Sequence, residues 1–127
     1  MKVIDLFAGP GGLGEGFSAL TAEDGGSPFK IAISIEKEDS AHRTLLLRAL
    51  FRQFKPDDIP EAYYEFLRGD LGKHPEDELY KLPELAEPLR KARIEAQKLT
   101  LGADSQKKIY GKIRNAVGKE DCILIGG

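Results

Sequence analysis

The stretch that decides the fold reads Asp5-Leu6-Phe7-Ala8-Gly9-Pro10-Gly11-Gly12-Leu13-Gly14-Glu15-Gly16-Phe17. Its glycines satisfy the pattern G-x-G-x-x-G at Gly9, Gly11 and Gly14. The apolar run from Lys2 to Phe7 predicts a buried strand before the glycines, and apolar residues at helical spacing predict a helix from Leu13 to Leu20. A glycine turn in this place lets a ligand approach the backbone and leaves the first N–H groups of the helix free to bind it.

A carboxylate follows at the end of the next predicted strand. Residues Phe29 to Ile35 are rich in β-branched side chains, and Glu36 comes directly after them. An acid about 20 residues beyond such a loop can accept hydrogen bonds from both hydroxyls of a ribose. The loop and Glu36 together predict a ligand that contains a nucleoside, and a glycine-rich turn without a ligand is the alternative.

Two residues bear on which nucleoside the loop binds. Asp5 places a carboxylate just before the glycines, where it disfavours a pyrophosphate and tolerates the ammonium group of a methionine moiety. Pro10 removes one backbone donor from the loop. Neither residue excludes a dinucleotide, and Asp5 is equally well interpreted as a partner for the helix dipole or the turn.

Beyond Glu36 the chain continues to alternate helices and strands. Residues Ser40 to Phe54 predict a helix, and Phe66 to Asp70 predict a brief third strand. The polar stretch 72–119 contains several prolines and reads as a helical insertion, and Cys122 to Gly127 form an apolar last strand. This order predicts an α/β fold in which a parallel sheet is flanked by helices on both faces.

Composition limits the possibilities further. The 127 residues suffice for one domain, and the net charge of −2 gives the whole chain no electrostatic attraction for a polyanion. Cys122 is the single cysteine, so an internal disulfide is excluded, and we expect it to be a buried small hydrophobe rather than a nucleophile. No residues have metal-ligand spacing, and no apolar run is long enough to cross a membrane. We expect a cytoplasmic protein.

A basic segment near the end of the insertion allows two interpretations. Lysines and arginines alternate with acids over much of the insertion, which is typical of a solvated face. The alternative is that Lys107, Lys108, Lys112 and Arg114 form a patch on one helix that contacts phosphates.

The stretch from Asp5 to Phe17 resembles the first motif of the DNA cytosine-5 methyltransferases, D-L-F-A-G-x-G-G followed by a phenylalanine. Ser34-Ile35-Glu36 is similar to the second motif of that family, and Gly69-Asp70-Leu71 is similar to the third. The segment from Asp121 to Gly127 resembles the approach to the catalytic loop, where a Pro-Cys pair follows the glycines. The resemblance implies a Rossmann-like sheet, here part of a class I methyltransferase domain that covers residues 1–127 with 72–119 inserted.

The resemblance also implies a site for S-adenosylmethionine, with S-adenosylhomocysteine as product. Glu36 would hold the ribose, Asp70 would accept from the adenine amino group, and Leu71 would donate a backbone bond and wall the ring. Lys37 stands where many relatives have a bulky apolar residue, so its alkyl stem would cover the adenine. The cofactor-binding residues expected in full are Phe7, Ala8, Gly9, Pro10, Gly11, Gly12, Glu36, Lys37, Asp70, Leu71 and Gly126.

In the family, a cysteine attacks a flipped-out cytosine in duplex DNA before its C5 receives the methyl group. That cysteine would follow Gly127 by a few residues, so we expect this chain to be an inactive, cofactor-binding front part of such an enzyme, of the kind found in restriction-modification. The alternatives are a subunit of a split methyltransferase and a dinucleotide-binding oxidoreductase domain. We also expect that an exposed sheet edge could lead to dimers or aggregates.

Overall fold

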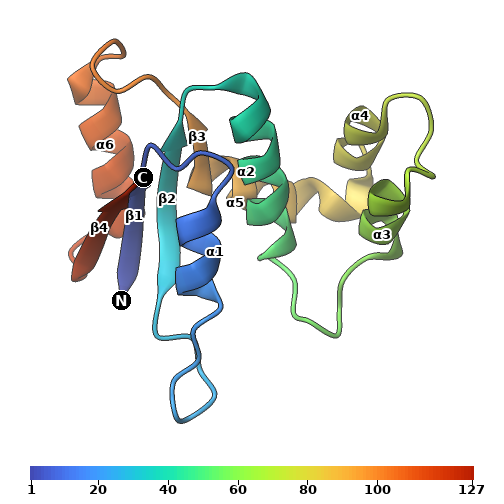
Figure 1. The fold of residues 1–127 in the computed structure, drawn as a ribbon, viewed down its shortest axis with the longest axis horizontal. Coiled ribbons are helices and arrows are strands. Elements are labelled where there is room, and N and C mark those ends of the chain that lie inside the picture. The colour runs from blue at the N-terminus through green and yellow to red at the C-terminus, as the bar shows by residue number, and fades with distance from the viewer.

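Four parallel strands form the centre of the computed structural model, which describes residues 1–127, and helices cover both faces of the sheet (Figure 1). The elements in chain order are β1 (Lys2–Leu6), α1 (Gly12–Ser18), β2 (Lys30–Glu36), α2 (Asp39–Phe51), α3 (Glu61–Arg68), α4 (Pro75–Tyr80), a short 3-10 helix (Pro83–Leu85), α5 (Ala86–Glu95), β3 (Ala96–Lys98), α6 (Gln106–Val117) and β4 (Cys122–Gly126). The Rossmann-like parallel sheet predicted from the sequence is confirmed.

The strand order is β3-β2-β1-β4, and every neighbouring pair is parallel. The chain builds outward from β1 through β2 to β3, and then crosses back to place β4 on the free side of β1. Because both faces of β1 and β2 are covered, these strands are buried over most of their length, at three of five residues in β1 and five of seven in β2. The direction of chain progression therefore reverses at β1, the strand that leads into the glycine loop.

A bulge in β2 decides which side chains face which layer. Val3 pairs with Ile31 and Ile4 with Ile33, so Ala32 is an extra residue in the register. An extra residue moves all later side chains of a strand to the opposite face. Ile33 consequently joins the core under α6, whereas Ile31 lies next to Gly14 of α1.

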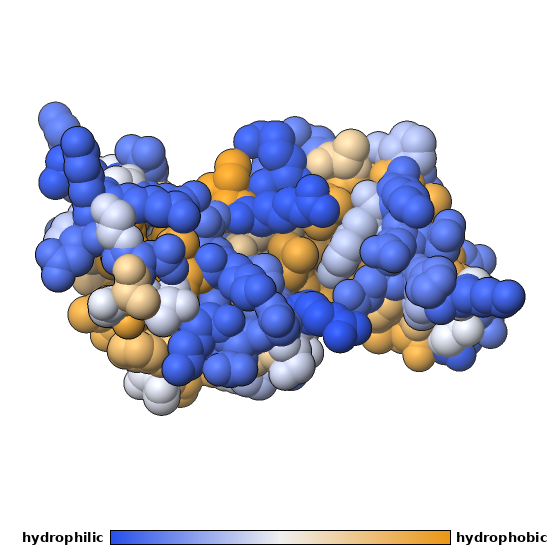
Figure 2. Space-filling view, turned by 90° about the horizontal axis from the view of Figure 1, so that it is seen from above, coloured by the Kyte–Doolittle hydropathy of each residue, from blue (hydrophilic) through white to orange (hydrophobic).

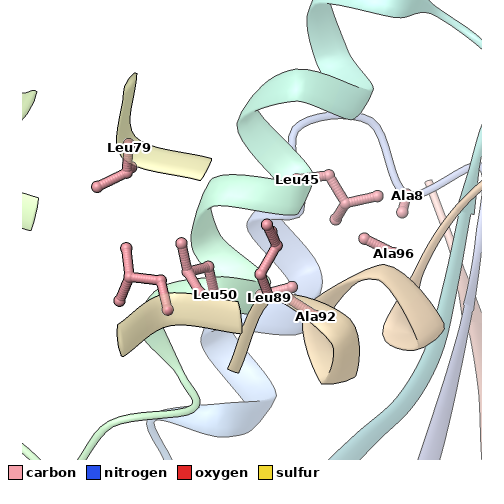
Figure 3. Packing of buried hydrophobic residues seen from close by; sticks show 9 residues of the cluster. Ala8, Leu45, Leu50, Leu79, Leu89, Ala92 and Ala96 are labelled. Atoms are coloured by element: carbon pink, nitrogen blue, oxygen red, sulfur yellow. The ribbon is translucent and has the colours of Figure 1, made fainter. Parts of the chain in front are cut away.

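Two apolar cores stabilise the two faces of the sheet. On one face, Leu45 and Leu50 of α2 pack with Leu89 and Ala92 of α5 (Figure 3). On the other face, α6 covers the strands with a buried side that includes Ile109 and Val117. In Figure 1, α3 and α4 lie beyond α2, on the side away from the sheet.

Between α2 and α6 one predicted strand is absent and one strand was not predicted. Phe66–Asp70 is not a strand, because α3 extends to Arg68 and Gly69 ends the helix in the left-handed conformation at φ 79°. The stretch 72–119 is mainly helical, as predicted, but it also contains the third strand of the sheet, β3, which pairs with β2. The helices in this stretch thus lead to β3, and α6 alone separates β3 from β4.

The outer strand β4 is paired on one side only, with β1. Cys122 is exposed at its start, so the expectation that this thiol is buried was wrong. Leu124 in the middle of the strand is 64% exposed. This is the apolar sheet edge that the sequence led us to expect, and association through it stays a prediction. No helix of the chain is both long and apolar enough to pass through a bilayer.

Candidate functional site

The glycine loop lies at the point where the sheet reverses its order. In open parallel sheets, ligands bind outside the carboxyl ends of the strands at this switch point. A cavity of about 290 Å³ opens there, close to the lower end of the range for small-molecule sites, about 300 to 1,000 Å³. Its lining residues come from the ends of all four strands: Phe7, Ile35, Glu36, Lys37, Leu99, Thr100, Leu101 and Gly127.

Backbone strain is concentrated at the start of the loop. Phe7 has a φ of 56°, and it is the one residue other than glycine with a positive φ. Phe7 is 59% exposed and lines the cavity, so burial does not compensate for its strained backbone. Such strain costs about 1 to 3 kcal/mol and is found mainly at functional sites. The conformation of Phe7 is therefore an independent sign that this loop binds a ligand.

Gly11 is the loop position where a side chain is least tolerated. It has a φ of 91°, and an added Cβ would lie 2.9 Å from Cδ1 of the buried Leu45. We expect Gly11→Ala to destabilise the fold by about 1 to 3 kcal/mol, measured by urea denaturation. Gly12→Ala is the matched control, because an added Cβ there meets nothing within 4 Å. Equal losses in the two variants would show that packing at Leu45 is not the cause.

Glu36 joins the end of β2 to the glycine loop. Its Oε2 accepts a hydrogen bond from the Gly9 N–H at 2.7 Å, and its Oε1 accepts from the N–H groups of Lys37 and Glu38 at 2.8 Å each. A second link, 3.0 Å from the Ala8 N–H to the Ile35 carbonyl, runs beside it. The carboxylate thus fixes the loop as well as facing the cavity.

These bonds determine the charge of Glu36 and the number of further hydrogen bonds that it can accept. Burial by itself raises the pKa of Glu36, but the N–H groups of Glu38, Gly9 and Lys37 outweigh it, so the pKa lies below its usual 4.5. The resulting stabilisation is present above that pH and is lost as the pH falls through the lowered value. Of about four acceptor positions on a carboxylate, one on Oε2 stays free. One ligand hydroxyl can therefore bind without displacing a backbone N–H, and a second cannot.

Asp5 does not face the cavity. Its carboxylate is fully buried beneath α1, and neither oxygen has a hydrogen-bond partner. Burial raises the pKa of Asp5, while the nearby Gly14 amide and the charge of Arg52 act in the opposite direction without closing a hydrogen bond. This placement favours the interpretation of Asp5 as a partner of the α1 dipole over contact with a ligand ammonium group.

The third wall of the cavity was missed in the sequence. Leu99, Thr100 and Leu101 follow β3 directly and add two apolar side chains to the cavity lining. The signal that could have revealed them is the run Leu99-Thr100-Leu101-Gly102, an apolar segment that ends in glycine like the loop after β1. Lys37 also lines the cavity and is exposed to solvent.

Two predicted site residues are not at this cavity. Asp70 follows α3, is 63% exposed and pairs with Arg68 at 3.2 Å. Leu71 packs against the core between α2 and α5. The physical reason is that their segment is a helix end beyond α2 rather than a sheet strand, so the structure does not bring them to this cavity. Their contact with an adenine stays a prediction.

The remaining predicted residues lie in the loop itself or next to it. The Gly11 N–H donates to the Ala8 carbonyl at 2.9 Å, the Pro10 carbonyl accepts from Arg48, and Gly12 begins α1. Gly126 packs against β1, where an added Cβ would lie 2.9 Å from the Leu6 carbonyl oxygen. The cavity is lined instead by Gly127, the residue directly after β4.

A second, larger cavity is a poorer candidate. It measures about 430 Å³ and lies between α2 and the start of α4. Only one of its seven lining residues, Phe66, is hydrophobic, and its Arg43 and Glu76 already neutralise each other in a 3.0 Å ion pair. Small-molecule sites are mostly apolar with a few convergent polar groups, which describes the cavity at Glu36 and not this one. No three His, Cys, Asp or Glu side chains come together as a metal site.

Comparison with known proteins gives one informative similarity. The chain is 43% identical over 68 residues to the type II methyltransferase M.Bpa9945I of Bacillus paralicheniformis (strain ATCC 9945a / NCIMB 11709 / CD-2). The similar region is 54% of this chain and 14% of that relative, so the chain corresponds to a small part of the relative's length. No protein-family model matches the chain. No solved structure matches it either.

Proposed function

We propose that this chain binds S-adenosylmethionine as part of a DNA cytosine-5 methyltransferase. The observation that carries the proposal is the bond between Glu36 and the Gly9 N–H. It holds a strained glycine loop and an ionised carboxylate together, beside a cavity at the switch point of a parallel sheet. The similarity to a methyltransferase supports methyl transfer over the other reactions that this sheet architecture serves.

The residues at the cavity fit such a cofactor chemically. Leu99, Leu101 and Phe7 offer apolar surfaces suited to an adenine ring, and the free acceptor position of Glu36 suits a ribose hydroxyl. The backbone between Phe7 and Gly12 would hold the methionine end, close to the first N–H groups of α1. When bound, S-adenosylmethionine supplies a methyl group on a sulfonium that is activated for transfer.

The finer assignment to cytosine C5 in duplex DNA rests on the run from Asp5 to Phe17. That run resembles the first motif of the cytosine-5 enzymes, and the relative's name, type II methyltransferase, is compatible with a role in restriction-modification. Under this proposal the chain positions the methyl donor, and duplex DNA is the partner that carries the acceptor. The third cofactor contact is assigned here to residues 99–101 in place of Asp70 and Leu71.

Isothermal titration calorimetry tests the proposal directly. We expect the 127-residue chain to bind S-adenosylmethionine and S-adenosylhomocysteine at one site, and to bind a nicotinamide dinucleotide at least tenfold more weakly. The discrimination is expected because Pro10 removes a pyrophosphate donor from the loop. Tight binding of the dinucleotide, with no binding of either sulfur compound, would identify the oxidoreductase alternative and overturn the proposal.

A further inference from the structure

The outer surface of α6 carries a concentrated positive charge. This helix, Gln106–Val117, contains no acidic residue, whereas each of the helices α1 to α5 contains at least one. Its four cations are Lys107, Lys108, Lys112 and Arg114. Taking these four charges from the net charge of −2 leaves −6 for the rest of the chain. The positive charge is therefore a local property of α6 and not a reflection of overall composition.

These four cations, which we name the α6 patch, have no partners within the protein. None takes part in an ion pair, although eight ion pairs link other residues of the chain. The nearest acids in sequence are already engaged, because Asp104 accepts from the Thr100 N–H and Glu120 pairs with Lys2. In Figure 2, hydrophilic side chains project from the end of the molecule where α6 lies in Figure 1.

The arrangement is unfavourable for the helix alone. Lys107 and Lys108 occupy the first turn, where the helix dipole already presents positive charge and where no acid compensates. Lys108 and Lys112 are four residues apart, so their like charges repel. No side chain caps this end of the helix. An anionic ligand would relieve all three unfavourable effects. A face that only contacts water would have no reason to keep them.

The spacing of the patch suits an extended ligand. Lys107 and Arg114 are two helical turns apart, about 10 Å along the axis, with the exposed Tyr110 on the same side between them. Nucleic-acid phosphates recur about every 3.4 Å along one strand and are bound by Lys, Arg and Tyr side chains. We infer that the α6 patch is a contact surface for the phosphate backbone of DNA.

The opposite side of α6 argues against a membrane as the partner. A helix that binds a membrane surface inserts its apolar face between the lipids. Here that face is used in the core, with Ile109 and Val117 buried and Ile113 packed against the same cluster. The choice of DNA over an acidic protein rests on the proposed function, since duplex DNA is the polyanion that the proposed enzyme would handle.

Fluorescence anisotropy with a labelled 24-base-pair duplex tests the inference. We compare the unsubstituted chain with a variant in which Lys107, Lys108, Lys112 and Arg114 are all changed to Gln. Four lost phosphate contacts should reduce the slope of log K against log salt by about 3 to 4. Between 50 and 200 mM salt, the affinity of the unsubstituted chain should accordingly fall about 100-fold more than that of the variant.

A matched variant controls for the change in net charge. Lys55, Lys73, Lys81 and Lys91 are exposed, lie outside α6 and make no ion pair, so changing these four to Gln removes the same charge from another surface. We expect this control to keep the salt slope of the unsubstituted chain. Equal slopes for the two quadruple variants would overturn the inference, because DNA attraction would then follow net charge alone.

Two further measurements separate this inference from the proposed function. The α6 variant should bind S-adenosylmethionine as the unsubstituted chain does, which also shows that it is folded. Binding of S-adenosylmethionine without any salt-dependent DNA binding would overturn the α6 inference and leave the proposed function standing. Displacement of the duplex by polyglutamate at equal charge concentration would identify an acidic protein surface as the partner and also overturn it.

Discussion

Replacing Arg52 with Ala is expected to destabilise the fold by about 3 kcal/mol. This is the largest loss we expect from removing any single charged side chain of this chain. Arg52 follows α2 and forms ion pairs with Glu15 of α1 and Glu95 at the end of α5. The side chains of Arg52 and Glu95 are only 14% and 11% exposed. Removing the guanidinium leaves a carboxylate buried without a countercharge, and urea denaturation followed by circular dichroism measures the cost.

The loss of unfolding free energy in Arg52→Ala should depend on pH, and the pKa of Glu95 determines the direction of this dependence. Burial raises the pKa of Glu95, and the charge of Arg52 acts against this shift. Without Arg52 the pKa rises further, so the folded state takes up a proton as the pH falls and the penalty for the buried charge disappears. The difference in unfolding free energy between Arg52→Ala and the unsubstituted chain should therefore be larger at pH 7 than at pH 5.

Arg43→Ala is the matched control for this prediction. Arg43 also belongs to α2 and pairs with a glutamate, Glu76, but its side chain is 65% exposed, so water screens the pair. We expect its denaturation midpoint to stay close to that of the unsubstituted chain. If Arg52→Ala destabilised the fold no more than Arg43→Ala, the ion pairs of Arg52 with Glu15 and Glu95 would not be a buried structural element.

The part of the fold nearest the glycine loop could be predicted from sequence because local signals and tertiary structure agree there. The apolar run before Gly9 forms the predicted strand, and Glu36 stands at the end of the next one, as expected. The bulge at Ala32 gives no such local signal, since it depends on how β2 pairs with β1. Which face each later residue of β2 occupies was therefore not predictable.

The error at Phe66–Asp70 has a physical reason that the sequence contains. Pro60, Glu61 in the first turn and Gly69 after the last turn are the start and stop signals of a helix, and α3 obeys them. The true third strand, Ala96–Lys98, has only three residues, and two of them are polar. Only its pairing with β2 therefore distinguishes it from the end of α5.

The second large effect is expected at Glu36, and it tests the proposed site. Glu36→Gln keeps the size of the side chain but removes the charge and turns one acceptor into a donor facing backbone N–H groups. A hydrogen bond to a charged group contributes about 1.5 to 3 kcal/mol, so S-adenosylmethionine should bind about 10- to 100-fold more weakly in calorimetry. Circular dichroism at the titration temperature establishes that the variant is folded.

Asp70→Asn is the control that distinguishes the site found in the structure from the site implied by the resemblance. If Asp70 accepted from the adenine amino group, its substitution would weaken binding about as much as that of Glu36. Because Asp70 directly follows α3 and pairs with Arg68 in solvent, we expect its substitution to leave the dissociation constant unchanged within twofold. Thr100→Val, at the wall after β3, should instead change binding without unfolding the chain. A weakened Asp70→Asn variant beside a normal Thr100→Val variant would restore the motif-based site. The order of the three affinities therefore decides whether the adenine lies at the wall after β3 or at the end of α3.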